Sequence, residues 1–246
     1  MAADSGEVPA RGRVRSALDL LATLSIIAVS LTTIWYLVYG SRIAPAQNPQ
    51  KKSSVPAVPT QALAMDGAPL LGSAAAGVGI VEFADFECPF CAKFAHETLP
   101  SLERDYLNNG RVVMAFRNLP LSIHRNAKAA AESAVCANQQ DKFWPYHGLL
   151  YRNARALDDA NLRRFAVATG LSLDKFDSCR SSGAFAGIES DTSLASTLRV
   201  AGTPTFFIGT LRGGQLKTAK VLVGAVPYDD LKAVLDALLQ GRITAQ

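Results

Sequence analysis

The fold of this chain is decided by the stretch Ile80-Val81-Glu82-Phe83-Ala84-Asp85-Phe86-Glu87-Cys88-Pro89-Phe90-Cys91. A β-rich run leads directly into a C-x-x-C motif, and a helical pattern follows. One helical turn brings the two cysteines within disulfide range. We predict Cys88 at the helix N-terminus, where free backbone N–H groups and the macrodipole favour a thiolate, and Cys91 as the less exposed resolving partner. Pro89 suits the first helical position, where its missing N–H has no intrahelical partner anyway.

A C-x-x-C motif can also be half of a zinc site. The sequence has no second C-x-x-C motif, and its other cysteines, Cys136 and Cys179, are single and distant. His96 follows Cys91 closely, but three ligands drawn from one helix start would make a poor closed site. We therefore predict redox chemistry with neither a metal nor another cofactor.

Composition allows a large core and argues against nucleic acid as a partner. The chain has 246 residues, of which 49% are hydrophobic, and a formal net charge of +4. This length fits one or two domains. A basic run with interleaved aromatic residues is missing from the sequence, so we expect no nucleic-acid binding.

Residues 17–39 are almost wholly apolar or hydroxylated, and Asp19 is their only charge. This segment is long enough to cross a bilayer as a helix, which takes about 20 residues. Its far end carries aromatic residues of the kind that gather at membrane interfaces, namely Trp35, Tyr36 and Tyr39. We therefore predict one N-terminal transmembrane helix.

Flanking charges predict the orientation of this helix. Arginines crowd its near side, whereas Arg42 is the only early charge on its far side. The positive-inside rule then leaves residues 1–16 in the cytoplasm and the rest of the chain outside. The alternative is a cleaved signal peptide, because residues 44–46 are small, although the apolar run exceeds the usual core of about 7–15 residues. Either way the bulk of the chain is exported, where disulfides persist.

Residues 40–66 are expected to form a flexible linker because most of them are Pro, Ala, Gln, Ser or Lys without an apolar period. The folded domain then covers residues 67–246. Its predicted elements, in order, are a loop (70–79), a strand (80–86), a helix kinked at Pro100 (89–108), a strand (111–118), five helices (126–140, 143–151, 158–169, 173–181 and 184–198), two strands (205–208 and 220–224) and a helix opened by Pro227.

Two positions outside the C-x-x-C motif carry a chemical signal. Glu82 interrupts an apolar strand, where a carboxylate is costly without a partner or a role. It either faces a wet edge of the sheet or lies beneath Cys91 as a proton acceptor with a raised pKa. In Gly202-Thr203-Pro204-Thr205, a proline just before an apolar strand is best used as a cis bond that bends the chain into that strand.

These residues together resemble the thioredoxin superfamily, and the helical block at about 122–199 resembles that of DsbA-like thiol:disulfide oxidoreductases. The resemblance runs from about Gly67 to Gln240 and rests on the strand, Cys-Pro-Phe-Cys and helix, on the later Gly-Thr-Pro-Thr, and on the closing helix. Two further stretches are similar to the membrane-anchored bacterial branch: Phe116-Arg117-Asn118-Leu119-Pro120-Leu121 with His124, and Lys142-Phe143-Trp144. The implied class is α/β, a thioredoxin-like fold with a helical insertion.

The resemblance implies a role for each matching position. Cys88 is the nucleophile, Cys91 the resolving cysteine and Glu82 the buried proton acceptor. Pro204 is the cis-proline beside the active disulfide, and Thr203 presents backbone groups to an extended substrate peptide.

Pro89 and Phe90, between the two cysteines, are assigned to substrate binding together with Thr203 and Pro204. Phe90 departs from the family pattern, since the best-known oxidising members have histidine there. A phenyl ring cannot stabilise the Cys88 thiolate as a histidinium would, so we expect a smaller depression of the Cys88 pKa and a less oxidising couple.

Four cysteines allow three disulfide pairings. With Cys88–Cys91 fixed by proximity, Cys136–Cys179 remains as a structural disulfide, and two buried free thiols are the alternative. Export of the domain favours the Cys136–Cys179 disulfide, because disulfides persist outside the cytoplasm.

The expected function is disulfide formation in exported cysteine-containing proteins, with re-oxidation by a quinone-linked membrane partner. Localisation would be the bacterial inner membrane, with the catalytic domain on the periplasmic side. One alternative is a reductase or isomerase of the same fold that receives electrons from a membrane donor. Another is a non-catalytic peptide-binding or chaperone module.

Overall fold

The computed structural model describes residues 11–40, 55–183 and 185–244, and of the side chains before residue 41 it describes 22–38. It divides into two units, Met1–Lys52 and Ser53–Gln246. The first unit holds α1 (Arg11–Trp35) and η1 (Tyr36–Gly40). Within the described residues, no helix is both long enough and apolar enough to cross a membrane. The predicted cytoplasmic residues 1–10 and linker residues 41–54 lie outside the described part.

The second unit is built on a mixed sheet with β3 at its centre. Among the described residues this sheet has six strands in the order β1-β6-β5-β3-β4-β2. The strands are β1 (Leu63–Ala64), β2 (Leu70–Gly72), β3 (Val78–Ala84), β4 (Val112–Asn118), β5 (Thr205–Arg212) and β6 (Gln215–Val223). β3 runs parallel to β4 and antiparallel to β5. Every residue of β3 is buried, as expected of a strand covered on both faces.

Two short strands were not expected from the sequence. The predicted loop over residues 70–79 is wrong at both ends, because β2 pairs with β4 and β3 already begins at Val78. β1 lies within the predicted linker, so the folded unit begins before residue 67. β6 likewise begins earlier than the predicted strand over 220–224. Strands of two or three residues are too short to show an alternating pattern, and their positions depend on pairing with distant residues.

Helices cover both faces of the sheet. The predicted helix over residues 89–108 is divided into α3 (Pro89–Glu97), α4 (Leu99–Leu102) and η2 (Glu103–Leu107). The break at Thr98 follows from Pro100, which has no N–H to continue the helical ladder. α10 (Tyr228–Leu239) packs on the same core as α3 and α4.

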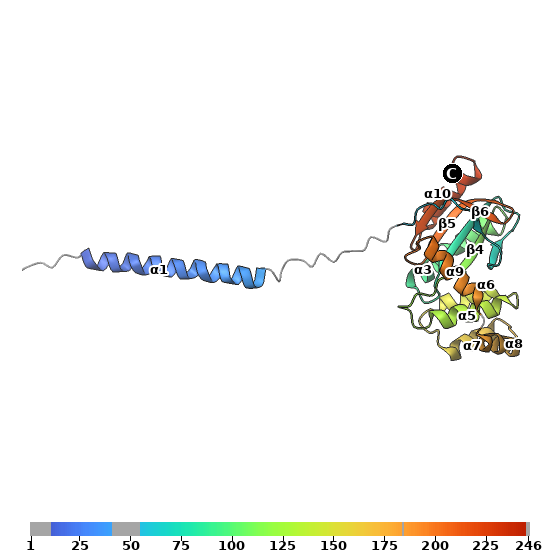
Figure 1. Ribbon diagram of the computed structural model, residues 1–246, viewed down its shortest axis with the longest axis horizontal. Helices are drawn as coiled ribbons and strands as arrows, with labels where there is room; N and C mark the ends of the chain where they lie inside the picture. The colour runs from blue at the N-terminus through green and yellow to red at the C-terminus, as the bar shows by residue number, and fades with distance from the viewer. Residues whose placement is uncertain (1–10, 41–54, 184, 245–246) are drawn as a thin grey trace, which may run out of the picture. The chain divides into compact units, whose positions relative to one another are not determined.

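The helical block lies between β4 and β5, at the predicted position. Its helices are α5 (Ala127–Asn138), α6 (Phe143–Arg152), α7 (Asp159–Ala168), α8 (Leu173–Ser182) and α9 (Ala186–Thr197). Helices α5 to α8 gather at one end of the folded unit, with α10 at the other (Figure 1). The core of the block is continuous with the buried side chains around Cys88 and Cys91.

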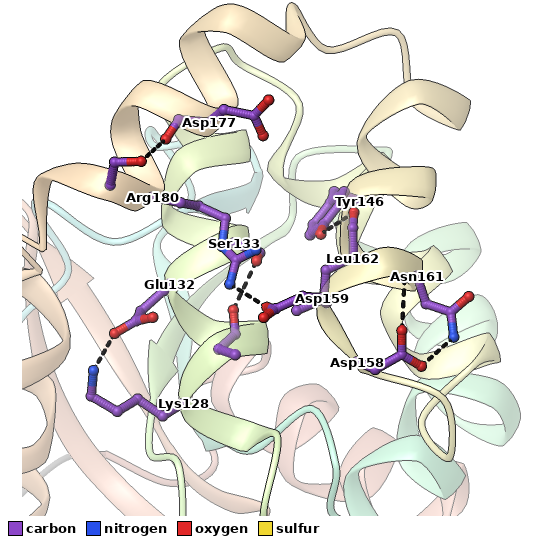
Figure 2. A network of polar contacts seen from close by, with 12 residues as sticks. Lys128, Glu132, Ser133, Tyr146, Asp158, Asp159, Asn161, Leu162, Asp177 and Arg180 are labelled. Atoms are coloured by element: carbon purple, nitrogen blue, oxygen red, sulfur yellow. Dashed lines mark hydrogen bonds and ion pairs between the residues drawn. The ribbon is translucent and has the colours of Figure 1, made fainter.

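A disulfide and several polar contacts hold the block together. Cys136 in α5 is bonded to Cys179 in α8, with a Cα–Cα distance of 5.7 Å. Arg180 pairs with Asp159 at 2.7 Å and so joins α8 to the start of α7. Figure 2 shows this ion pair beside the hydroxyl of Tyr146, which donates to a backbone carbonyl of α7.

Removing this disulfide is expected to destabilise the protein without removing its chemistry. For a sequence separation of 43 residues, the chain-entropy model assigns the bridge about 4 kcal/mol of unfolding free energy. A Cys136→Ala/Cys179→Ala double variant should therefore unfold at a clearly lower urea concentration. A midpoint equal to that of the wild type would show that the bridge contributes nothing to stability.

Candidate active site

Cys88 and Cys91 lie at the start of α3, directly after the sheet. Cys88 is the N-cap residue of α3, and Pro89 takes the first helical position. The Cys88 N–H donates to the Asp85 carbonyl at 3.2 Å, which forms the turn between β3 and the helix. Both cysteines are free thiols, and their residues are 4% and 0% exposed respectively. The sequence predicted this order of exposure, although the margin is small.

The Gly202–Thr205 loop faces Cys88 from the other side. The Thr203–Pro204 peptide bond is cis. The Cys88 thiol donates to the Thr203 carbonyl at 3.3 Å across a sequence separation of 115 residues. Pro204 is buried, and its carbonyl accepts from the Gly224 N–H at 2.8 Å. The structure therefore brings Cys88, Thr203 and Pro204 together, whereas Phe90 points outward and is 60% exposed.

The surroundings of Cys88 favour its thiolate. A hydrogen bond from the Cys91 thiol, acting against the cost of burial, lowers the pKa of Cys88 to about 5. The Thr203 side chain and the backbone N–H groups of Cys91 and Phe90 act in the same direction. These N–H groups are the unpaired donors expected at a helix N-terminus. The pKa of Cys91 is raised well above its ordinary value, first by burial and then by Cys88.

We expect the thiolate absorbance of the reduced protein to rise with a midpoint near pH 5, because Cys88 ionises there. Cys88→Ser should remove this transition and leave only absorbance from Cys91 at high pH. A midpoint near 9 would mean that the helix start and the Cys91 thiol do not stabilise the thiolate. A midpoint near 3.5, as in DsbA itself, would show that the phenyl ring of Phe90 does not limit the stabilisation.

Glu82 lies in the middle of β3 and is 2% exposed, which excludes the wet edge as its environment. It pairs with Phe116 on β4 and Phe206 on β5, so it lies between aromatic neighbours. Burial raises the pKa of Glu82 to about 8. Its charge is in turn one cause of the raised pKa of Cys91. Glu82 is therefore mostly protonated at neutral pH and is electrostatically coupled to Cys91.

Two carboxylates just before Cys88 were not assigned a role from the sequence. Asp85 is buried and accepts from the Glu87 N–H at 2.7 Å, from the Leu121 N–H at 2.8 Å and from His124 Nδ1 at 2.8 Å. Burial is the largest influence on His124 and opposes its charge, but the hydrogen bond to Asp85 and the charges of Asp85, Cys88 and Glu87 together raise the pKa of His124. Glu87 accepts from the Asn126 N–H at 2.6 Å.

These bonds fix the turn before Cys88 to the segment that follows β4. In the sequence, His124 stands out only as part of a stretch that resembles the family. Its partner Asp85 lies in a different segment, so the sequence does not show that the two residues meet. Within the part of the chain that the structure describes, no group of three or more His, Cys, Asp or Glu side chains is placed to hold a metal ion.

The sequence of the chain is similar to a known family and to several named proteins. The family model described as "Thioredoxin" matches residues 65–236. "Na(+)/H(+) antiporter NhaA 3" of Salinispora tropica is 34% identical over 200 residues, which are 77% of this chain and 29% of that protein. "Disulfide bond formation protein D" of Bacillus subtilis is 26% identical over 192 residues, 72% of this chain and 79% of that protein. The chain thus spans less than a third of the first of these relatives.

Solved structures show the same fold. Oxidised BdbD from Bacillus subtilis superposes with a TM-score of 0.65 at 25% identity, covering 75% of this chain and 98% of that one. Alpha-DsbA1 from Wolbachia pipientis superposes with a TM-score of 0.61 at 23% identity, covering 72% of this chain and 92% of that one.

Proposed function

The chain belongs to the thioredoxin family and its folded unit is DsbA-like, and from this premise we propose that it is a thiol:disulfide oxidoreductase that forms disulfides in other proteins. One observation supports this most. The free Cys88 thiol lies at the start of α3, faces the Thr203 carbonyl at 3.3 Å and has a pKa lowered to about 5. A cysteine with a low pKa is ionised at neutral pH and leaves readily from a mixed disulfide, as disulfide exchange requires.

In the proposed reaction a client thiolate attacks Cys88 Sγ of the oxidised Cys88–Cys91 pair. A client–Cys88 disulfide forms, the Cys88–Cys91 bond breaks, and its electron pair stays on Cys91 Sγ. Protonated Glu82 gives its proton to that thiolate. A second client thiolate then attacks the client sulfur of the mixed disulfide, which releases the oxidised client and leaves Cys88 as a thiolate.

Three features of the site favour this direction. The low pKa of Cys88 stabilises the reduced enzyme that the reaction leaves behind. Glu82, with a pKa of about 8, holds a proton at neutral pH to give to Cys91. Thr203 and cis-Pro204 border Cys88 where an extended client segment would bind, with Pro89 and Phe90 on the exposed side. In the reductase alternative the same atoms react in the reverse direction, whereas in the isomerase alternative the Cys88 thiolate attacks a client disulfide and is released when another client thiolate re-forms one.

We place this reaction outside the cytoplasm, at a bacterial inner membrane. The support comes from the sequence: residues 17–39 resemble a single-pass anchor, residues 1–16 would be cytoplasmic, and 40–66 would link the anchor to the domain. Re-oxidation of Cys88 and Cys91 would then fall to a quinone-linked membrane partner. Extraction of membranes with alkaline carbonate tests the anchor, because an anchored protein stays in the pellet.

Trapping of mixed disulfides tests the proposed activity. Cys91→Ala cannot resolve a client–Cys88 disulfide from within the enzyme, so adducts with exported cysteine-containing proteins should accumulate and disappear on reduction. Cys88→Ser/Cys91→Ala is the matched control and should trap nothing. If Cys91→Ala trapped no more than this control, the folded unit would instead be a peptide-binding module with unreactive cysteines.

A further inference from the structure

Tyr151, near the end of α6, buries a hydroxyl group that finds no hydrogen-bond partner among the described atoms. The residue is 3% exposed, and its ring packs against Phe86 at 5.1 Å and His147 at 4.7 Å between centroids. Tyr146, five residues earlier on α6, buries its hydroxyl too, but this hydroxyl donates to the Leu162 carbonyl at 2.9 Å. A buried hydroxyl without a partner costs free energy, so this one calls for an explanation.

The hydroxyl shares a buried compartment with the reacting groups. Tyr151 belongs to the same core cluster as Cys88 and Cys91, and α6 packs against α3. Glu82 pairs with Phe116 on the neighbouring strand, so both side chains lie on one face of the sheet. That face is covered by α6, since the Phe116 ring lies 5.4 Å from the ring of His147.

The groups around the hydroxyl are mainly acids. Burial raises the pKa of Tyr151 well above its ordinary value, and charges on Cys91, Glu82, Asp85 and Cys88, in that order, raise it further. Tyr151 therefore stays protonated at working pH and keeps a proton that it can donate to a negative charge.

Two histidines also lie close to Tyr151. Burial, aided by His96, lowers the pKa of His147 to about 3, so His147 is neutral. His96, on α3, places its Nε2 atom 3.2 Å from the backbone carbonyl of Tyr151 and not at the Tyr151 hydroxyl. His147 therefore brings no positive charge to the hydroxyl, and His96 contacts the backbone carbonyl of Tyr151 instead.

We propose that the Tyr151 hydroxyl is the hydrogen-bond donor for the negative charge that passes between Cys91 Sγ and the Glu82 carboxylate during disulfide exchange. This inference rests on the proposed function and adds a residue to it. When the Cys88–Cys91 bond breaks, its electron pair makes Cys91 a thiolate, and the Glu82 proton then moves the charge to the carboxylate. In the reduced protein, which the structure describes, Cys91 and Glu82 are both protonated at neutral pH and the hydroxyl has no partner. The bond forms only while the charge exists, so it stabilises the reaction and not the fold.

Tyr151→Phe removes the hydroxyl and keeps the ring contacts. The rate at which a dithiol reduces the oxidised protein should fall by at least about tenfold, because a preorganised donor is lost from a buried developing charge. The ionisation midpoint of Glu82, followed by carbon NMR of its carboxyl group in the oxidised protein, should move to higher pH. The thermal unfolding midpoint should stay equal or rise, because an unpaired buried hydroxyl has been removed.

Tyr146→Phe is the matched control. It deletes a hydroxyl that has a partner in the helical block, so it should lower the unfolding midpoint and leave the Glu82 midpoint and the pH–rate profile unchanged. A Tyr151→Phe protein with wild-type rate and wild-type Glu82 midpoint would overturn the inference. Failure of the wild type to react with thiols would instead overturn the proposed function. In that case the ionisation midpoint of Glu82 would still show whether the Tyr151 hydroxyl donates to the carboxylate.

Discussion

Cys88→Ser is expected to reduce thiol–disulfide exchange to the uncatalysed background. Cys88 is the group at the start of α3 that combines a thiol with a pKa lowered to about 5. A serine hydroxyl in its place neither ionises near neutral pH nor forms a disulfide, so the covalent intermediate is lost. Cys91 cannot replace it, because it is 0% exposed and its own pKa is raised.

The measurement is oxidative refolding of a reduced, disulfide-containing client protein. Cys136→Ala/Cys179→Ala is the control, because it removes the other two cysteines of this chain but should keep the exchange rate at temperatures where it is folded. Appreciable activity in Cys88→Ser would mean that the reaction does not pass through this sulfur.

The stability of the reduced protein should rise relative to that of the oxidised protein as the pH increases from 5 to 8. The Cys88 pKa is about 5 in the folded reduced protein, against 9.0 as its ordinary value. Because the folded pKa is the lower one, its stabilisation is complete above the unfolded pKa and is lost as the pH falls to 5. Between these values the reduced protein gains roughly 1.4 kcal/mol per pH unit, or about 4 kcal/mol from pH 5 to 8.

The oxidised protein lacks this contribution, because a disulfide does not titrate. Glu82 has the opposite sign: its folded pKa of about 8 lies above its ordinary 4.5, so its contribution is lost as the pH rises through this range. Burial, which raises the pKa of Glu82, is common to both redox states, so this contribution cancels to first order in their difference. Urea unfolding of both forms at pH 5 and pH 8 gives that difference. A gap between the two forms that is independent of pH would contradict a stabilised Cys88 thiolate.

Much of the site could be predicted because its chemistry is carried by local sequence. The C-x-x-C motif after a strand indicates the helix start at Cys88, a proline before a strand indicates the bend at Thr203–Pro204, and an acid in an apolar strand indicates Glu82. Long amphipathic helices such as α5 to α9 show their period over several turns. These signals do not depend on knowing which distant residues meet.

The parts that could not be predicted depend on contacts between distant segments. β1 and β2 are strands only because β6 and β4 offer them partners. Asp85 becomes important because the segment after β4 donates two hydrogen bonds to it. Tyr151 looks like ordinary core packing in the sequence, and only its unpartnered hydroxyl, whose pKa the charges of Cys91 and Glu82 raise, sets it apart.

The reduction potential of the Cys88–Cys91 pair tests the account most directly, because a stabilised reduced state makes the pair an oxidant. Equilibration with glutathione buffers, followed by alkylation and mass measurement, gives this potential. A value above about −180 mV is expected, as for proteins that donate disulfides. A value near −270 mV, as in thioredoxin, would contradict it and would assign the same cysteines to reduction.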